Sequence, residues 1–146
     1  MSSAVESQSY AEGMRYENWR GKGSNYTDGS AYGQSKLANV FMAQQLYRRF
    51  GVASVSVHPG IIATDLGRYR TLSGFLDYVI GFLFNSARMN ADQGSWNQLW
   101  AAVAPGLTEG HYWPVGQERP ASHPSASDAA ASAECWDRSH ALLASF

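Results

Sequence analysis

The stretch SAYGQSKLANVFMAQQLYRRFGVASVSVHPG, residues 30–60, predicts a helix followed by a strand. From Ser30 to Phe50, apolar and aromatic residues recur at steps of three or four positions, which is the period of an amphipathic helix. Asp28 or Ser30 is available as the N-cap of this helix, and Gly51 follows it as a C-terminal stop. We therefore expect a long helix that buries one face.

The residues after this helix predict a short buried strand at 53–57. The segment VASVSVHPG, residues 52–60, contains three valines, whose branched side chains favour extended backbone. Pro59 and Gly60 end the run, as they commonly do at the end of a strand.

A second amphipathic helix is expected from about Asp92 to Val103, with Asp92 as its cap. Its large apolar residues lie at positions i, i+3, i+4 and i+7, and we expect this face to pack against another part of the protein. These residues are Trp96, Leu99, Trp100 and Val103. One or two helical turns are also expected within 71–84 and within 129–143.

The remaining segments predict one more strand and two loops. The sequence GHYWPVG, residues 110–116, is typical of a short strand, which Pro114 restricts to an edge of the sheet or to its own end. Residues 6–29 have no sustained period and predict a long loop that covers something or has a role. Residues 117–134 are rich in Ala, Ser and Pro, which favours a surface loop or linker.

The order of these elements is helix, strand, helices, strand, which predicts an α/β fold with the end of a parallel sheet. We expect residues 1–146 to form a single unit. Two parallel strands cannot cover the faces of three amphipathic helices. We therefore expect this unit to contain the end of a sheet and not an entire one.

The composition excludes several classes of function. The formal net charge is −1, so there is no basic stripe for a nucleic-acid backbone. The apolar segment at 71–84 contains Asp77 and two glycines and is too short to span a membrane. The N-terminus shows no secretory signal, and the single cysteine, Cys135, rules out an internal disulfide, so we expect a cytoplasmic location. The four histidines lack the spacing of metal ligands, and we expect no metal site.

Tyr32 and Lys36 are the residues that point to chemistry. Residues four apart on a helix lie on the same face, so the phenol and the ammonium should be neighbours. A positive charge beside a phenol favours the ionised form, which allows proton exchange with a hydroxyl or a carbonyl. A packed tyrosine beside a solvated lysine is the plain alternative, because this spacing also arises by chance.

Two motifs together resemble the short-chain dehydrogenase/reductase family, most closely its retinol-dehydrogenase-like and fungal members. They are YGQSKLAN at residues 32–39 and SVHPGIIATDL at residues 56–66. The resemblance extends from Met1 to about Gly116 and covers the C-terminal half of the family only. It implies a partial Rossmann-like doubly wound fold that lacks the N-terminal dinucleotide-binding strands.

The resemblance assigns catalytic roles to three residues. Tyr32 would donate a proton to the substrate oxygen or accept one from it. Lys36 would favour the phenolate of Tyr32 and hydrogen-bond the nicotinamide ribose. The segment MSSAV at the start is similar to the family's serine segment, so Ser3 would polarise the substrate carbonyl, with Ser2 as the alternate. Without the resemblance, Ser3 reads as a terminal serine with no role.

The resemblance also implies a cofactor loop after the strand at 53–57. In it, Pro59, Gly60, Ile62 and Thr64 would contact NADP or NAD, Ile62 through its backbone at the carboxamide and Thr64 near the pyrophosphate. A turn that simply ends a strand is the alternative for this segment. The glycine-rich turn that cradles a dinucleotide is absent from the sequence, as is the residue that selects between the two cofactors.

Two functions are compatible with these observations. The first is an NAD(P)-dependent oxidoreductase that acts on an alcohol or carbonyl of a hydrophobic small molecule, such as a polyketide, retinoid or steroid-like compound of secondary metabolism. The apolar segment at 67–90 would then be the substrate lid, although a helix packed in a core explains it equally well. The second is an inactive truncated remnant that acts as an interaction module and self-associates through exposed apolar surface.

Overall fold

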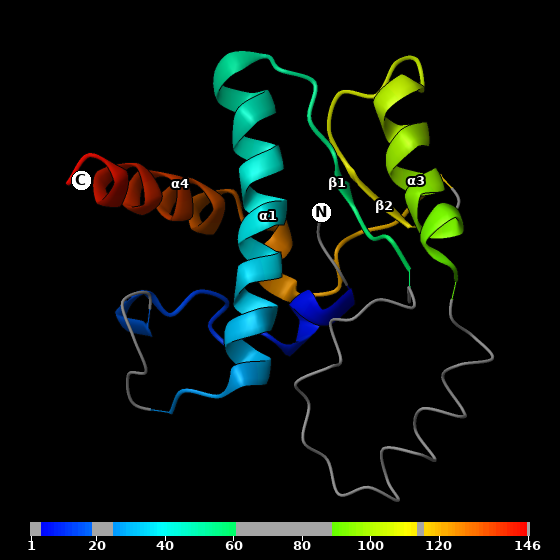
Figure 1. Cartoon of the computed structure of the whole chain (residues 1–146). Coiled ribbons are helices and arrows are strands. Elements are labelled where there is room, and N and C mark those ends of the chain that lie inside the picture. The colour runs from blue at the N-terminus through cyan, green and yellow to red at the C-terminus, as the bar shows by residue number, and fades with distance from the viewer. Residues whose placement is uncertain (1–3, 19–24, 61–88, 114–115, 146) are drawn as a thin grey trace, which may run out of the picture.

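The computed structural model describes residues 4–18, 25–60, 89–113 and 116–145. Within these ranges the chain forms three α-helices, a small sheet and several short 3-10 turns (Figure 1). The α/β class expected from the sequence is confirmed. The helical turns expected within 71–84, and most of the expected lid, lie outside the described residues.

Helix α1, Asp28–Phe50, is the longest element and forms where the sequence predicts it. Its N-cap is Thr27, whose hydroxyl oxygen accepts a hydrogen bond from the Ser30 amide at 3.1 Å. Our expectation of Asp28 or Ser30 as the cap was wrong, because several residues in a row have capping side chains. The expected stop at Gly51 is confirmed: this residue has a φ of 66°, and its amide donates to the carbonyls of Leu46 and Tyr47.

The sheet has three short strands in the order β1-β2-β3. They are β1, Ser56–Val57, β2, His111–Trp113, and β3, Gln117–Glu118. β1 pairs with β2 in parallel, and β2 pairs with β3 in antiparallel fashion. β1 is shorter than the expected 53–57. β2 lies between the two other described strands and ends just before Pro114, so the expectation that Pro114 marks a sheet edge or the end of its strand is confirmed in its second form. Within the described residues, β1 has a strand neighbour on one side only.

Helix α3, Ala91–Val103, is capped by Asn90 and not by Asp92 as expected. Asn90 and Gln93 form a reciprocal capping box, since each side chain accepts a hydrogen bond from the backbone amide of the other. The helix buries its small and polar side, Gly94 and Asn97, toward the sheet.

The apolar face of α3 is mostly exposed, so our expectation that it would be packed was wrong. Trp96, Leu99 and Val103 are 55%, 61% and 80% exposed, respectively. Trp100 is the exception, because its ring stacks at a tilt on Tyr112 of β2 with 5.3 Å between the centroids. The period of a sequence predicts an apolar face on a helix, but it does not predict which part of the protein packs against that face.

The C-terminal segment is more ordered than the sequence suggested. Residues 117–134, expected to be a surface loop or linker, contain β3, the 3-10 turn η4, Pro124–Ser127, and the start of α4, Ala129–Leu143. The Asp128 carboxylate caps α4 by accepting from the amides of Ala130 and Ala131, which explains why a helix begins inside an Ala/Ser-rich stretch.

The N-terminal segment lies against α1, as a covering loop would. It contains two 3-10 turns, η1, Ala4–Gln8, and η2, Tyr16–Asn18, where we expected only loop. Tyr10 is 6% exposed, and Glu6 is completely buried. Gln34 of α1 fixes this segment, since its side chain accepts from the Arg15 amide at 2.6 Å and donates to the Arg15 carbonyl at 3.4 Å.

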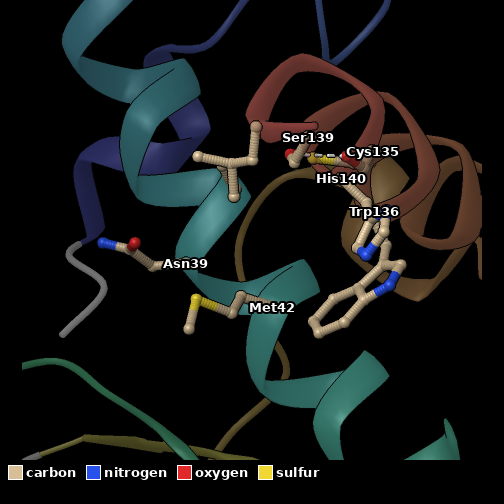
Figure 2. A pocket seen from close by; sticks show the side chains of 8 residues that line it. Asn39, Met42, Cys135, Trp136, Ser139 and His140 are labelled. Atoms are coloured by element: carbon tan, nitrogen blue, oxygen red, sulfur yellow. Dashed lines mark hydrogen bonds between the residues drawn. The ribbon is translucent and has the colours of Figure 1, made fainter. Parts of the chain in front are cut away.

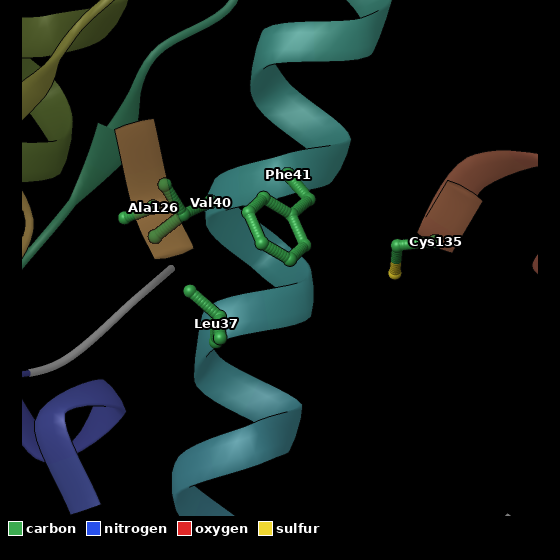
Figure 3. Close-up of a cluster of buried hydrophobic side chains, with 5 residues drawn as sticks. All are labelled: Leu37, Val40, Phe41, Ala126 and Cys135. Atoms are coloured by element: carbon green, nitrogen blue, oxygen red, sulfur yellow. The ribbon is translucent and has the colours of Figure 1, made fainter. Parts of the chain in front are cut away.

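The apolar core lies between α1 and the C-terminal segment (Figure 3). Its members are Leu37, Val40, Phe41, Ala126 and Cys135. A buried amide also ties the two parts together, because Gln45 donates to the Ser132 hydroxyl at 2.9 Å. In the part of the chain that the structure describes, no helix is long and apolar enough to cross a membrane.

Two glycines at the ends of α1 provide a matched test of this fold. Gly51→Ala should lower the free energy of unfolding by about 1–2 kcal/mol, because alanine is disfavoured at positive φ. Gly29→Ala should raise it by roughly 0.5–1 kcal/mol, because Gly29 is helical and no atom lies within 4 Å of an added Cβ. Urea denaturation measures both, and changes of the same sign would contradict the assigned helix ends.

Candidate active site

Tyr32 and Lys36 lie side by side on α1. The Lys36 Nζ is 5.0 Å from the centroid of the Tyr32 ring, within the range of a cation–π contact. Tyr32 is 37% exposed, and Lys36 is half-buried. The arrangement therefore places a phenol and a cation where a ligand can reach them.

The surroundings of Tyr32 fix the first turns of α1. Gln34 is buried beneath the N-terminal segment, so the adjacent turn cannot rotate freely. The Ser35 hydroxyl donates to the Tyr32 carbonyl at 2.7 Å. The helix thus buries one side against the protein and leaves Tyr32 on the other.

The Tyr32/Lys36 pair lies at the end of the molecule where parallel strands end. α1 runs in the opposite direction to β1, and β1 and β2 are parallel, so the beginning of α1 and the carboxyl ends of both strands share one end (Figure 1). In open α/β sheets, ligands bind outside the carboxyl ends of the strands. This is the position that a cofactor or substrate would occupy.

The predicted cofactor loop is described only at its start. Pro59 and Gly60 follow β1 and are half-buried, and Gly60 has a φ of 86°, which favours glycine. Ile62 and Thr64 lie outside the described residues, as do Ser3 and its alternate Ser2. The structure therefore places the end of β1 and the Tyr32/Lys36 pair at the same end of the molecule, and the assigned cofactor contacts stay predictions.

A buried polar cluster where β1 and β2 begin was not expected from the sequence. Glu6 is completely buried, and its Oε1 accepts the Ser122 amide at 3.1 Å and lies 4.0 Å from His111 Nε2. His111 Nδ1 in turn lies 2.7 Å from the Ser56 hydroxyl. An acidic residue in a polar segment normally reads as exposed, so no sequence signal pointed to Glu6.

Burial affects the charge of two histidines of the sheet, His111 at the beginning of β2 and His58 directly after β1. Burial lowers the pKa of His111 and, more than any other influence, that of His58. The Glu6 carboxylate opposes the effect at His58, whereas His111 adds to it. Both imidazoles are therefore favoured in their neutral form.

The apolar groove between α1 and α4 is separate from the Tyr32/Lys36 pair (Figure 2). It has a volume of about 270 Å³ and is lined by Met42, Trp136, Leu143 and their neighbours, and by none of the predicted site residues. Burial raises the pKa of the Cys135 thiol to about 11, although a hydrogen bond with Ser139 opposes this. The thiol in this groove is therefore protonated at neutral pH and is a poor nucleophile.

No cluster of three or more His, Cys, Asp or Glu side chains that could hold a metal occurs among the described residues. The donors at the site are instead a phenol and an ammonium, which fit ribose hydroxyls and a carbonyl oxygen. This donor set suits a nicotinamide cofactor with its substrate.

Comparison with known proteins gives the site its context. No family model matches the chain. Over 143 residues it is 35% identical to the proposed daunorubicin C-13 ketoreductase DnrU of Streptomyces sp. (strain C5), a match that covers 95% of this chain and 47% of that protein. It is 42% identical over 86 residues to a short-chain dehydrogenase/reductase of Armillaria gallica, covering 56% of this chain and 26% of the relative. This chain belongs to the short-chain dehydrogenase/reductase family.

Human retinol dehydrogenase 11 is a further relative, with 32% identity over 64% of this chain and 29% of its own length. The chain spans about half the length, or less, of the curated relatives that it matches. The family resemblance inferred from YGQSKLAN and SVHPGIIATDL is confirmed.

The neutral histidines predict how stability depends on pH. A histidine whose folded pKa lies below its unfolded value binds fewer protons in the folded state, so its contribution to stability is present above about pH 6.5 and is lost as the pH falls. The melting temperature should therefore drop between pH 7.5 and pH 5.5.

His111→Asn should reduce that drop, because it removes one of the two buried imidazoles. His140→Asn on exposed α4 is the control and should leave the drop unchanged. Thermal unfolding followed by circular dichroism at both pH values measures the difference. An equal drop in the wild type and the His111 variant would contradict the assigned burial effect.

Proposed function

We propose that this chain carries the reacting end of an NAD(P)-dependent short-chain dehydrogenase/reductase that interconverts an alcohol and a carbonyl. The observation that carries the proposal is the exposed Tyr32/Lys36 pair at the carboxyl ends of β1 and β2. Membership of the family supports it, since relatives are named as ketoreductase and retinol dehydrogenases.

The proposed chemistry divides between the cofactor and the chain's own residues. A bound nicotinamide cofactor, NAD or NADP, would supply or accept the hydride at the substrate carbon. In reduction, Tyr32 gives its phenol proton to the substrate oxygen, and in oxidation the phenolate takes that proton back. Lys36 compensates the negative charge that develops on Tyr32 and donates hydrogen bonds to the ribose.

The other assigned residues complete the reacting end of the site. Ser3 would hold the substrate oxygen by donating a hydrogen bond. Pro59, Gly60, Ile62 and Thr64 would line the nicotinamide side of the cofactor. The sequence contains no glycine-rich turn for the dinucleotide phosphates, so the proposal concerns the reacting end only.

For the substrate, we propose a hydrophobic small molecule. The names of two relatives refer to daunorubicin and to retinol, and both are organic molecules with an extended carbon framework. The apolar residues expected in the 67–90 segment suit such a molecule.

Cofactor titration with variants of α1 tests the proposal. NADH and NADPH should each be titrated into the protein and followed by nucleotide fluorescence. Lys36→Ala should weaken binding at least tenfold, because it removes the ribose donor. Tyr32→Phe should change binding little and lower turnover of apolar aldehydes and ketones by about 10²–10⁴-fold, because it removes the proton donor.

Tyr47→Phe is the matched control, because Tyr47 lies on the same helix, about three turns from Lys36 and about four turns from Tyr32. It should change neither binding nor turnover. No change in nucleotide fluorescence at millimolar cofactor would rule out the proposed activity for this chain.

Self-association is the second candidate role, and the exposed apolar face of α3 favours it. Sedimentation velocity should show a concentration-dependent increase in the sedimentation coefficient, which Leu99→Lys should abolish by placing a charge on that face. Ala130→Lys adds the same charge on exposed α4 and should leave the association unchanged. A monomer at all concentrations would exclude this role.

A further inference from the structure

Asn97 links the ends of two strands to helix α3. It lies on the buried side of α3 and is 2% exposed. Its amide nitrogen donates to the His58 carbonyl at 3.0 Å and lies 3.4 Å from the Tyr112 carbonyl, to which it also donates. Its amide oxygen accepts a hydrogen bond from the Gly116 amide at 3.0 Å. One side chain thus satisfies three backbone groups from three parts of the chain.

These backbone groups belong to the site end of the sheet. His58 directly precedes Pro59 and Gly60, where the assigned cofactor loop begins. The Tyr112 carbonyl also accepts a hydrogen bond from the His58 amide at 2.8 Å, which links the ends of the two strands. Asn97 is a second donor to this carbonyl. Buried carbonyls need donors, and the Asn97 amide is the donor supplied by α3.

The turn after β2 rests on the same helix. Gly116 has a φ of 67°, and a Cβ added there would lie 2.9 Å from the Trp100 ring. The Gly116 amide donates to Asn97, one helical turn before Trp100. Asn97 and Trp100 therefore form the part of α3 that contacts the backbone where β1 and β2 end.

We propose that Asn97 is a positioning residue for Pro59 and Gly60, the described start of the assigned cofactor loop. By holding the His58 carbonyl, it fixes the direction in which these two residues leave β1. This inference rests on the proposed function as far as the cofactor is concerned. The fixed strand end itself follows from the hydrogen bonds alone.

A purely structural role for Asn97 would act differently from a positioning role. Any buried amide that holds a helix in place lowers global stability when it is removed. Gln45 provides the comparison, because it is 4% exposed and ties α1 to α4 through Ser132, away from the strand ends. A positioning role predicts a local loosening at His58 and Gly116 that a Gln45 variant does not produce.

Amide hydrogen exchange tests this difference on the whole chain. The variants are Asn97→Leu, which keeps the side-chain size, Asn97→Ala in case the first does not fold, and Gln45→Met as the control. Exchange at His58 and Gly116 is measured relative to the Phe41 amide in α1, which reports global opening. In the Asn97 variants, the His58 and Gly116 amides should exchange at least tenfold faster relative to Phe41, and in Gln45→Met the ratio should stay unchanged.

Cofactor affinity supplies the second readout. If the wild type binds NADPH or NADH, Asn97→Leu should weaken binding at least tenfold, and a Gln45→Met protein with the same loss of melting temperature should bind as the wild type does. If the wild type binds neither, the proposed function fails for this chain, and the exchange ratio alone decides the role of Asn97. An unchanged ratio in the Asn97 variants, or an equal change in Gln45→Met, would overturn the proposal.

Discussion

The parallel pairing of β1 with β2 is the constraint on which the rest of the structure depends. Parallel strands need a crossover connection, and α3 is the described part of that crossover. The pairing sends both carboxyl ends in one direction, toward the end where α1 begins. Tyr32 and Lys36 become a candidate site because of this arrangement, since a tyrosine and a lysine on an isolated helix would face only water.

Buried polar groups link α3 and the N-terminal segment to the two ends of the β1/β2 pair. The apolar core of Leu37, Val40 and Phe41 joins α1 to the C-terminal segment. The carboxyl ends of β1 and β2 instead carry the Asn97 hydrogen bonds, and the Glu6, His111 and Ser56 contacts lie where the two strands begin. Hydrogen bonds have narrow geometry, so such contacts fix the direction of a chain better than apolar contacts do. This is the kind of support that a catalytic arrangement requires.

Much of the fold could be predicted from the sequence, for clear physical reasons. Helix α1 follows from the spacing of Leu37, Val40 and Phe41 and from Gly51, which adopts the backbone conformation that ends a helix. The closeness of Tyr32 and Lys36 follows from their i, i+4 spacing alone. Both depend on interactions that are local in the chain, and local interactions are visible in the sequence.

Apart from the N-caps of α1 and α3, where neighbouring residues compete for the same position, the predictions that failed depend on contacts between distant residues. A stripe such as Trp96, Leu99 and Val103 shows that a helix is amphipathic, but not what covers it. Asn97 and Glu6 are polar residues in polar surroundings, and their burial follows only from partners far away in the chain, such as His58 for Asn97 and Ser122 for Glu6. The same reason hid the ordered turn η4 within 117–134, because it packs on α1. The helical turns expected within 129–143 are confirmed as α4.

The central claim is that a nicotinamide cofactor binds where α1 begins and β1 ends. Two-dimensional ¹H–¹⁵N NMR during titration with NADPH, and separately with NADH, tests it most directly. The account predicts that the amide shifts change at Tyr32, Lys36, His58 and Gly60. Shift changes confined to the groove between α1 and α4, or no changes at millimolar cofactor, would contradict it.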